Sequence, residues 1–421
     1  MGILERPDGE VEITAGREYP LGTTRASVPT QVRQGALTKG DERDESDTAV
    51  AKNRRERRYQ LREVARSIAP GALRGCGRTM LVVNERVEVK INDGVGHFTG
   101  LATCGSVWMC PVCEAKIRHK RALMVERWLN QAFEMGHGVE FVTLTCRHWL
   151  GQALADLFSR SQKAFHGMRM QRAFRDLMAR FELRWIMVRE VLHGPINGWH
   201  PHFHLAVITW TPLTDTERAE LEDGFWRGWS HQLQGVGLSA LRGPGVLIKP
   251  CTSRSGLAEY LCKVVGDDAR PTRGLALELT RGDLKTSKTS LLRTPEQILS
   301  DFADTGDQAD RALYREYCIA TKARRMMTIT KGLKQHLSIN EPDQTDEELA
   351  TAEVGGETLL RMGRTAWGRV VALDLRLHLL VVAETSGRAG LRALMTKIAP
   401  DDFWYIVQPP ETVHTEGENA A

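Results

Sequence analysis

No hydrophobic run long enough to cross a membrane occurs in this sequence of 421 residues. A transmembrane helix needs about 20 consecutive apolar residues, and a secretory signal needs a basic start followed by a shorter apolar run. Residues 1–70 contain neither pattern. We therefore expect a cytoplasmic protein that does not bind membranes.

A large excess of charge of either sign is also absent. The 57 Lys and Arg residues nearly balance the 53 Asp and Glu residues, which leaves a formal net charge of +4. This balance neither demands nor excludes nucleic acid as a partner. Hydrophobic residues make up 42% of the chain and charged residues 26%, which is typical of a folded protein with a large core.

The changes in polarity along the chain predict five segments and no internal repeat. Strands joined by short connections pair antiparallel, so we expect an α+β fold with an antiparallel central sheet covered by helices on one face. The expected segments are a polar, largely disordered tail at 1–70 with a basic helical stretch at 53–66, a cysteine-bearing hairpin and helix at 71–134, the central sheet at 135–270, a basic helical extension at 271–340, and a small α/β segment of unassigned role at 341–421.

The motif His200-Pro-His-Phe-His204 carries the strongest chemical signal. Residues two apart in a strand project from the same face, so His202 and His204 place two imidazoles side by side. A hairpin that turns at Asn197-Gly198 would put Glu190 opposite one of them. Two imidazoles and a carboxylate with open positions suit Mg²⁺ or Mn²⁺, which would polarise a scissile phosphate.

Two points about this motif stay open. His193 competes with Glu190 as the third ligand, and we expect His200 to be a positioning residue. The alternative is that these histidines are ordinary polar side chains on a half-buried strand.

A helix that begins near Thr252 supplies a candidate nucleophile, Tyr260, with Lys263 one turn away. A phenol has an ordinary pKa of about 10, and a nearby ammonium group and a divalent metal favour its oxyanion as a nucleophile on phosphorus. Lys263 would also stabilise the charge on the pentavalent phosphate. The alternative is a tyrosine at the edge of a helix core.

Cysteines form a second candidate metal site. Cys104, Cys110 and Cys113 give a C-x5-C-x2-C array, and Cys76 precedes the hairpin that leads back to them. In a reducing compartment such a group favours zinc over disulfides, and four thiolates make a closed structural zinc site. His97 is the alternative to Cys76.

Candidate DNA contacts follow from charge and aromatic character. Arg324, Arg325 and Lys331 are suited to phosphates, although such residues also occur on solvated helix faces. Trp149 and Trp199 flank the motifs and are candidates for stacking on an extruded base, with core packing as the alternative.

Taken in order, these motifs resemble the plasmid rolling-circle replication initiators of the Rep type, within the HUH endonuclease superfamily. The resemblance runs from about Arg74 to Leu337. The segments that match are Phe141–Thr145, Gly198–His204 with Glu190 ahead of it, Tyr260–Lys263, the cysteine segment Cys104–Cys113 and the later stretch Tyr317–Leu333.

The resemblance implies a ferredoxin-like or RRM-like nuclease domain at 135–270, preceded by a zinc knuckle. Tyr260 would nick one strand at a plasmid double-strand origin and leave a 5′-phosphotyrosine link and a 3′-OH that primes host polymerase. Double- and single-stranded origin DNA, a host helicase and a second copy of the chain are the implied partners. Some members carry a Glu one turn before the tyrosine, thought to activate water for termination, and this chain departs from the family pattern there with Gly256.

Other functions remain as alternatives. A single-strand transposase or a relaxase shares the chemistry, but relaxases usually place the tyrosine ahead of the histidines, whereas Tyr260 follows them. Two alternatives come from other classes: a zinc-containing DNA-binding regulator without catalysis, in which the histidines are structural, and a metal hydrolase that acts on a small molecule.

Overall fold

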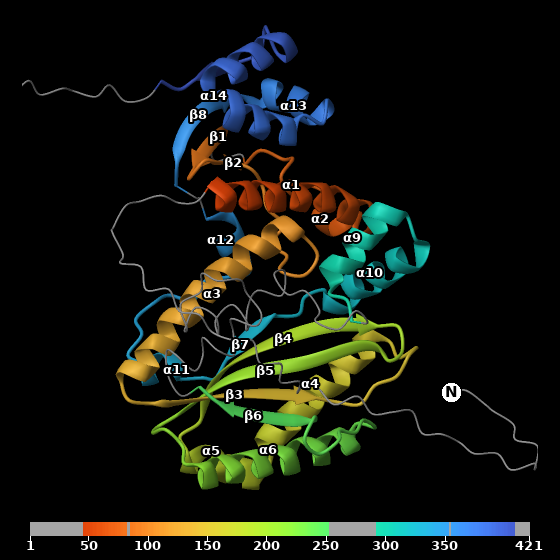
Figure 1. Cartoon of the computed structure of the whole chain (residues 1–421), viewed down its shortest axis with the longest axis vertical. Coiled ribbons are helices and arrows are strands. Elements are labelled where there is room, and N and C mark those ends of the chain that lie inside the picture. The colour runs from red at the N-terminus through yellow and green to blue at the C-terminus, as the bar shows by residue number, and fades with distance from the viewer. Residues whose placement is uncertain (1–44, 82–84, 252–291, 353–354, 409–421) are drawn as a thin grey trace, which may run out of the picture. The chain divides into compact units, whose positions relative to one another are not determined.

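The computed structural model describes residues 45–81, 85–251, 292–352 and 355–408, and the fold is given for these residues (Figure 1). Helices surround two antiparallel sheets, which confirms the expected α+β class. Tyr260, Lys263 and Gly256 lie outside the described residues. Within the part of the chain that is described, no helix has the length and apolar character needed to cross a bilayer.

The larger sheet has five strands in the order β6-β3-β5-β4-β7, and every neighbouring pair is antiparallel. This is the antiparallel central sheet that the sequence predicts. Two strand-helix-strand units follow one another along the chain, and β5 lies between β3 and β4 in the sheet. The strands are β3 Gly138–Thr145, β4 Arg184–Gly194, β5 Gly198–Thr209, β6 Val246–Pro250 and β7 Met327–Ile329.

Helices α4 (Leu154–Met170), α5 (Arg172–Arg180) and α6 (Asp215–Gly235) lie on one side of this sheet (Figure 1). Phe203 of β5 points to them, with its ring centroid 5.7 Å from that of Phe165 and 6.0 Å from that of Trp229. Burying such an aromatic side chain contributes about 1.5–3 kcal/mol. Because neighbouring residues in a strand alternate between faces, His202 and His204 project from the opposite face.

Residues 292–337 are part of this core and not a separate basic extension. β7 is the edge strand of the central sheet, next to β4. The preceding helices are α9 (Pro295–Thr305) and α10 (Gln308–Thr321), and Ile298 and Leu299 of α9 are fully buried with the residues of β3 and β5. These helices are mostly polar in sequence and bury only a narrow apolar face, so the sequence alone suggested a separate extension.

The second sheet corrects the expected division between segments 71–134 and 341–421. Its order is β2-β1-β8-β9, so the early hairpin and the C-terminal segment build one sheet. A two-stranded hairpin alone is marginally stable in water, and β8 supplies the missing neighbour. The strands are β1 Val87–Asn92, β2 Val95–Thr99, β8 Glu357–Met362 and β9 Trp404–Ile406, and α13 Arg364–Ala372 and α14 Arg376–Ile398 pack on them.

The tail expected at 1–70 is wrong from Glu45 onward. Helix α1 runs from Glu45 to Ile68, and its Leu61 and Ala65 are buried in the main core. The basic stretch at 53–66 is therefore part of a packed helix, in which Arg62 and Arg66 are themselves buried. The remaining helices are α2 Pro70–Leu73, α3 Pro111–Glu134, α11 Leu333–His336 and α12 Asp346–Thr351, and both α1 and α12 contact α3.

The tight turn between β4 and β5 fixes their register. Gly194 pairs with Gly198, which has a φ of +70°. A Cβ at Gly198 would lie 3.3 Å from Leu150 Cα and 3.4 Å from the Trp149 carbonyl oxygen. The turn therefore requires glycine for its backbone conformation and for the close approach of the neighbouring loop.

We predict that Gly198→Ala destabilises the protein more than Gly151→Ala. Both glycines have positive φ, +70° and +91°, and an L-residue in that region costs about 1–2 kcal/mol. Only position 198 adds a close backbone contact, since nothing lies within 4 Å of a Cβ at Gly151. Urea unfolding of both variants measures the difference, and equal losses would contradict this account of the turn.

Candidate functional site

The structure brings Glu190, His202 and His204 together on adjacent strands. Glu190 pairs directly with His202 in the β4–β5 register. One carboxylate oxygen, Glu190 Oε2, lies 2.8 Å from His202 Nε2 and 2.9 Å from His204 Nε2. The three donor groups lie within 4.8 Å of one another. Two nitrogens and an oxygen that converge in this way fit a small divalent cation.

The same register places Glu190, and not His193, beside the two histidines. His193 pairs with Trp199 across the hairpin. Its ring centroid lies 4.8 Å from that of Trp199, and its backbone bonds to Arg293. It is therefore packed beside the core and lies outside the three-residue group.

Strand β3 orients His204 from the other side. Thr143 pairs with His204 in the sheet, and its Oγ1 lies 3.1 Å from His204 Nδ1. The Phe141 ring stacks on the imidazole with a centroid distance of 5.2 Å. If Nε2 held a metal, Nδ1 would carry the proton and donate a hydrogen bond to Thr143 Oγ1. Phe141 and Thr143 both lie in Phe141–Thr145, a segment through which the sequence resembles the Rep initiators. That resemblance was the one sequence feature that pointed to Thr143.

His148, which the sequence did not single out, extends the row of imidazoles. Its Nδ1 lies 2.8 Å from the Asn197 carbonyl oxygen, and its Nε2 lies 2.5 Å from His200 Nδ1. Because a carbonyl only accepts, Nδ1 of a neutral His148 donates and Nε2 accepts from His200. The lone pair of His200 therefore resides on Nε2.

Burial favours the neutral form of two of these rings, His148 and His200. His202 and His204 are 7% and 8% exposed. Burial lowers the pKa of His148, and it lowers the pKa of His200 well below its ordinary value. Neutral imidazoles are the form that binds metal.

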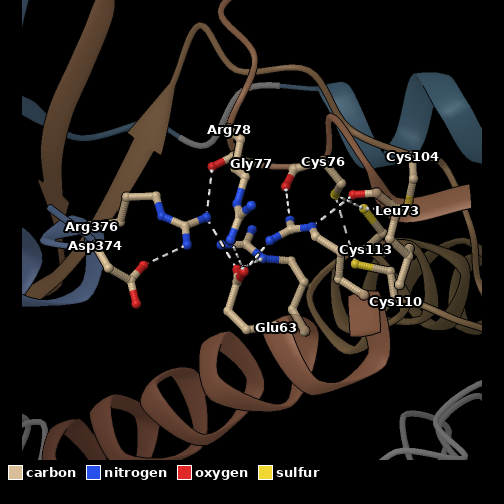
Figure 2. Close-up of polar contacts among 12 residues, drawn as sticks. Glu63, Leu73, Cys76, Gly77, Arg78, Cys104, Cys110, Cys113, Asp374 and Arg376 are labelled. Carbon is tan, nitrogen blue, oxygen red and sulfur yellow. Dashed lines mark hydrogen bonds and ion pairs between the residues drawn. The ribbon is translucent and has the colours of Figure 1, made fainter. Parts of the chain in front are cut away.

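The four cysteines that the sequence grouped also converge (Figure 2). Cys76 Sγ lies 3.8 Å from Cys110 Sγ and 3.6 Å from Cys113 Sγ, and Cys104 Sγ lies 3.6 Å from Cys113 Sγ. A tetrahedral zinc with Zn–S bonds of about 2.3 Å separates its sulfurs by about 3.8 Å. His97 lies on β2 opposite Lys90 and outside the group, so Cys76 is the fourth member.

Arginine side chains hold the Cys76 loop in place. Arg66 donates to the Cys76 carbonyl oxygen at 2.6 Å and to the Leu73 carbonyl oxygen at 3.0 Å. Hydrogen bonds from the other three thiols lower the pKa of Cys76 most, and the charge of buried Arg62 lowers it further. The surroundings of Cys76 therefore favour its thiolate form.

Glu63 links this loop to α14 (Figure 2). Its carboxylate forms an ion pair with Arg66. It also lies 2.6 Å from Nη2 of Arg78 and 3.1 Å from Nη1 of Arg376. Arg376 also pairs with Asp374 at 2.8 Å. The cysteine group is thus tied to the second sheet through ion pairs.

The candidate DNA contacts differ in exposure. Arg325 and Lys331 are exposed. Arg324 is half-buried, because its guanidinium lies 5.2 Å from the Phe158 ring centroid and Nε donates to the Ala320 carbonyl oxygen at 2.7 Å. Arg324 therefore has a packing role in the fold.

Two known proteins from Streptomyces are similar to this chain in sequence. A protein from Streptomyces lividans named "Protein rep" is 31% identical over 353 residues, which cover 67% of this chain and 75% of that protein. A "Neomycin resistance protein" from Streptomyces cyanogenus is 30% identical over 144 residues, 27% of this chain and 32% of that protein.

No family model and no solved structure matches the chain. The similarity to the Streptomyces lividans protein covers 75% of that protein at 31% identity. The chain therefore belongs to the family of plasmid Rep proteins.

Proposed function

We propose that this Rep protein initiates rolling-circle replication by nicking one strand of plasmid origin DNA. The observation that carries the proposal is the convergence of Glu190, His202 and His204 on one face of an antiparallel sheet. A group of two imidazoles and a carboxylate suits a cation that acts on a phosphodiester. Membership of the Rep family supplies the biological setting.

The connectivity of the central sheet supports assignment to the HUH nuclease type. Strands β3, β4, β5 and β6 appear in the sheet as β6-β3-β5-β4, with helices after β3 and after β5. This is the strand-helix-strand-strand-helix-strand pattern of a ferredoxin-like domain. The face opposite α4 and α6 carries the candidate ligands.

In this function, bound Mg²⁺ or Mn²⁺ would polarise the scissile phosphate. Glu190, His202 and His204 hold the cation, while Thr143 fixes the orientation of His204. His148 and His200 stay neutral beside them. The protein groups thereby place one net negative charge, that of Glu190, against the cation.

Tyr260 is the proposed nucleophile. Its oxygen forms a bond to phosphorus as the bond from phosphorus to the 3′-oxygen breaks, and the phenolic proton passes to solvent or to the departing oxygen. The products are a 5′-phosphotyrosine link and a 3′-OH end from which a host polymerase can extend, with a host helicase separating the strands. Lys263 stabilises the pentavalent phosphate.

We further propose a structural zinc ion at Cys76, Cys104, Cys110 and Cys113. The sulfur separations of 3.6–3.8 Å support it, because they match the edge of a zinc tetrathiolate, about 3.8 Å. Four thiolates around zinc leave a net negative charge, which buried Arg62 partly offsets.

Removing the imidazoles in His202→Ala/His204→Ala should lower Mn²⁺ affinity and nicking of supercoiled plasmid together. We expect at least a 100-fold loss of nicking, since metal ions supply several kcal/mol of charge stabilisation. Mn²⁺ titration calorimetry and agarose gels measure the two effects. His166→Ala, which removes an exposed imidazole on α4, is the control. Normal nicking by the double variant would exclude the metal site.

Tyr260→Phe should abolish the covalent DNA adduct while leaving Mn²⁺ affinity unchanged. The loss of nicking should be about 1000-fold or more, because the phenolic oxygen forms the new bond. Gel electrophoresis in SDS with 5′-labelled product detects the adduct. Tyr405→Phe removes a hydroxyl that bonds to Arg86 and Arg361 in the other sheet and should keep full activity. An adduct formed by Tyr260→Phe would refute the assignment.

The purified protein should contain one zinc per chain, and Cys113→Ser should lose it. Structural zinc contributes directly to folding, so this variant should also unfold at a lower temperature. Cys146→Ser is the matched control, because Cys146 is buried and belongs to the core. Elemental analysis that finds equal zinc in both variants would disprove the site.

A further inference from the structure

Three large apolar side chains are exposed beside the row of histidines. Trp149 and Leu150 are each 59% exposed in the segment between β3 and α4, and Ile196 is 68% exposed in the β4–β5 turn. The two loops touch, since a Cβ at Gly198 would lie 3.3 Å from Leu150 Cα. Exposed apolar groups that gather in this way mark binding surfaces.

Hydrogen bonds connect this surface to the candidate metal group. His148 precedes Trp149, and its ring bonds to the Asn197 carbonyl at 2.8 Å and to His200 at 2.5 Å. The His200 ring centroid lies 5.1 Å from that of His202. Both loops are therefore held at the edge of the proposed reaction centre.

The same loop carries a cation that fits a nucleic-acid occupant. Arg147 is exposed, and its guanidinium has no hydrogen bond or ion pair to any other residue of the described ranges. Its backbone N–H donates to the Ser239 carbonyl oxygen at 2.7 Å, which fixes the loop without using the side chain. A guanidinium suits a phosphate, and an exposed indole suits the face of a base.

The sequence left open whether Trp149 and Trp199 stack on a base or pack in the core, and the structure gives the two residues different surroundings. Trp199 is 2% exposed and stacks on Tyr317 with a centroid distance of 6.3 Å, so its face is already covered. Among the described residues, the Trp149 indole is 59% exposed and can contact a ligand. In duplex DNA the base faces are covered by their neighbours, so an exposed indole stacks more readily on an unpaired base.

We propose that Arg147, Trp149, Leu150 and Ile196 form a binding site for one unpaired nucleotide of the DNA substrate. Trp149 stacks on the base over the apolar floor of Leu150 and Ile196, and Arg147 pairs with the adjoining phosphate. This inference rests on the proposed function in taking DNA as the substrate. It adds a site that holds the strand next to the scissile phosphate.

Trp149→Ala tests the site by fluorescence anisotropy with a labelled oligothymidylate of about twelve nucleotides, without divalent metal. Loss of one base stack should weaken binding about 10-fold, and Trp149→Phe should recover most of it. Trp210→Ala is the matched control, because Trp210 is 54% exposed at the opposite end of β5. It should bind normally, and all variants should show wild-type circular dichroism.

Arg147→Ala provides a second measurement. Loss of one phosphate contact should lower the slope of log affinity against log salt by about 0.7. Unchanged affinity in Trp149→Ala, an equal loss in Trp210→Ala, or an equal loss for the matching duplex would each overturn the inference. Oligothymidylate binding through Trp149 by a protein that never nicks plasmid would overturn only the proposed function.

Discussion

The pairing of Glu190 with His202 across β4 and β5 is the constraint on which the rest of the site depends. A slip of one residue in this register would turn both histidines toward α4 and α6 and move Phe203 out of the core. The burial of Phe203 therefore holds the chemical face in place. Gly198 allows the turn that sets the register and the close approach of the loop that carries His148.

Around that pair, the protein gathers several imidazole side chains and one carboxylate, that of Glu190. Buried imidazoles with lowered pKa, at His148 and His200, keep positive charge away from the position where a cation would bind. Thr143 and Phe141 restrict His204 from β3. A site held from three neighbouring strands would lose little conformational freedom on binding the proposed cation, which would favour precise orientation of a phosphate.

The cysteine group performs a different task. It joins the loop before β1 to the start of α3, and the ion pairs of Glu63 extend this connection to Arg376 of α14. Segments far apart in the sequence thereby stabilise one another. The second sheet, which β1 and β8 build together, follows the same principle, because neither the hairpin nor the C-terminal segment has enough strands alone.

The sequence by itself determined the features that depend on neighbouring residues. The alternation of His202 and His204 and the C-x2-C spacing are local, and each predicted its geometry. The turn predicted at Asn197-Gly198 lies at residues 195–197, because Gly198 already pairs with Gly194 as the first residue of β5. Tertiary structure alone decided the rest: Cys76 over His97, the pairing of β1 with β8, the place of β7, and the burial of Trp199 against the exposure of Trp149. These outcomes depend on contacts between segments distant in sequence, whose packing no local pattern encodes.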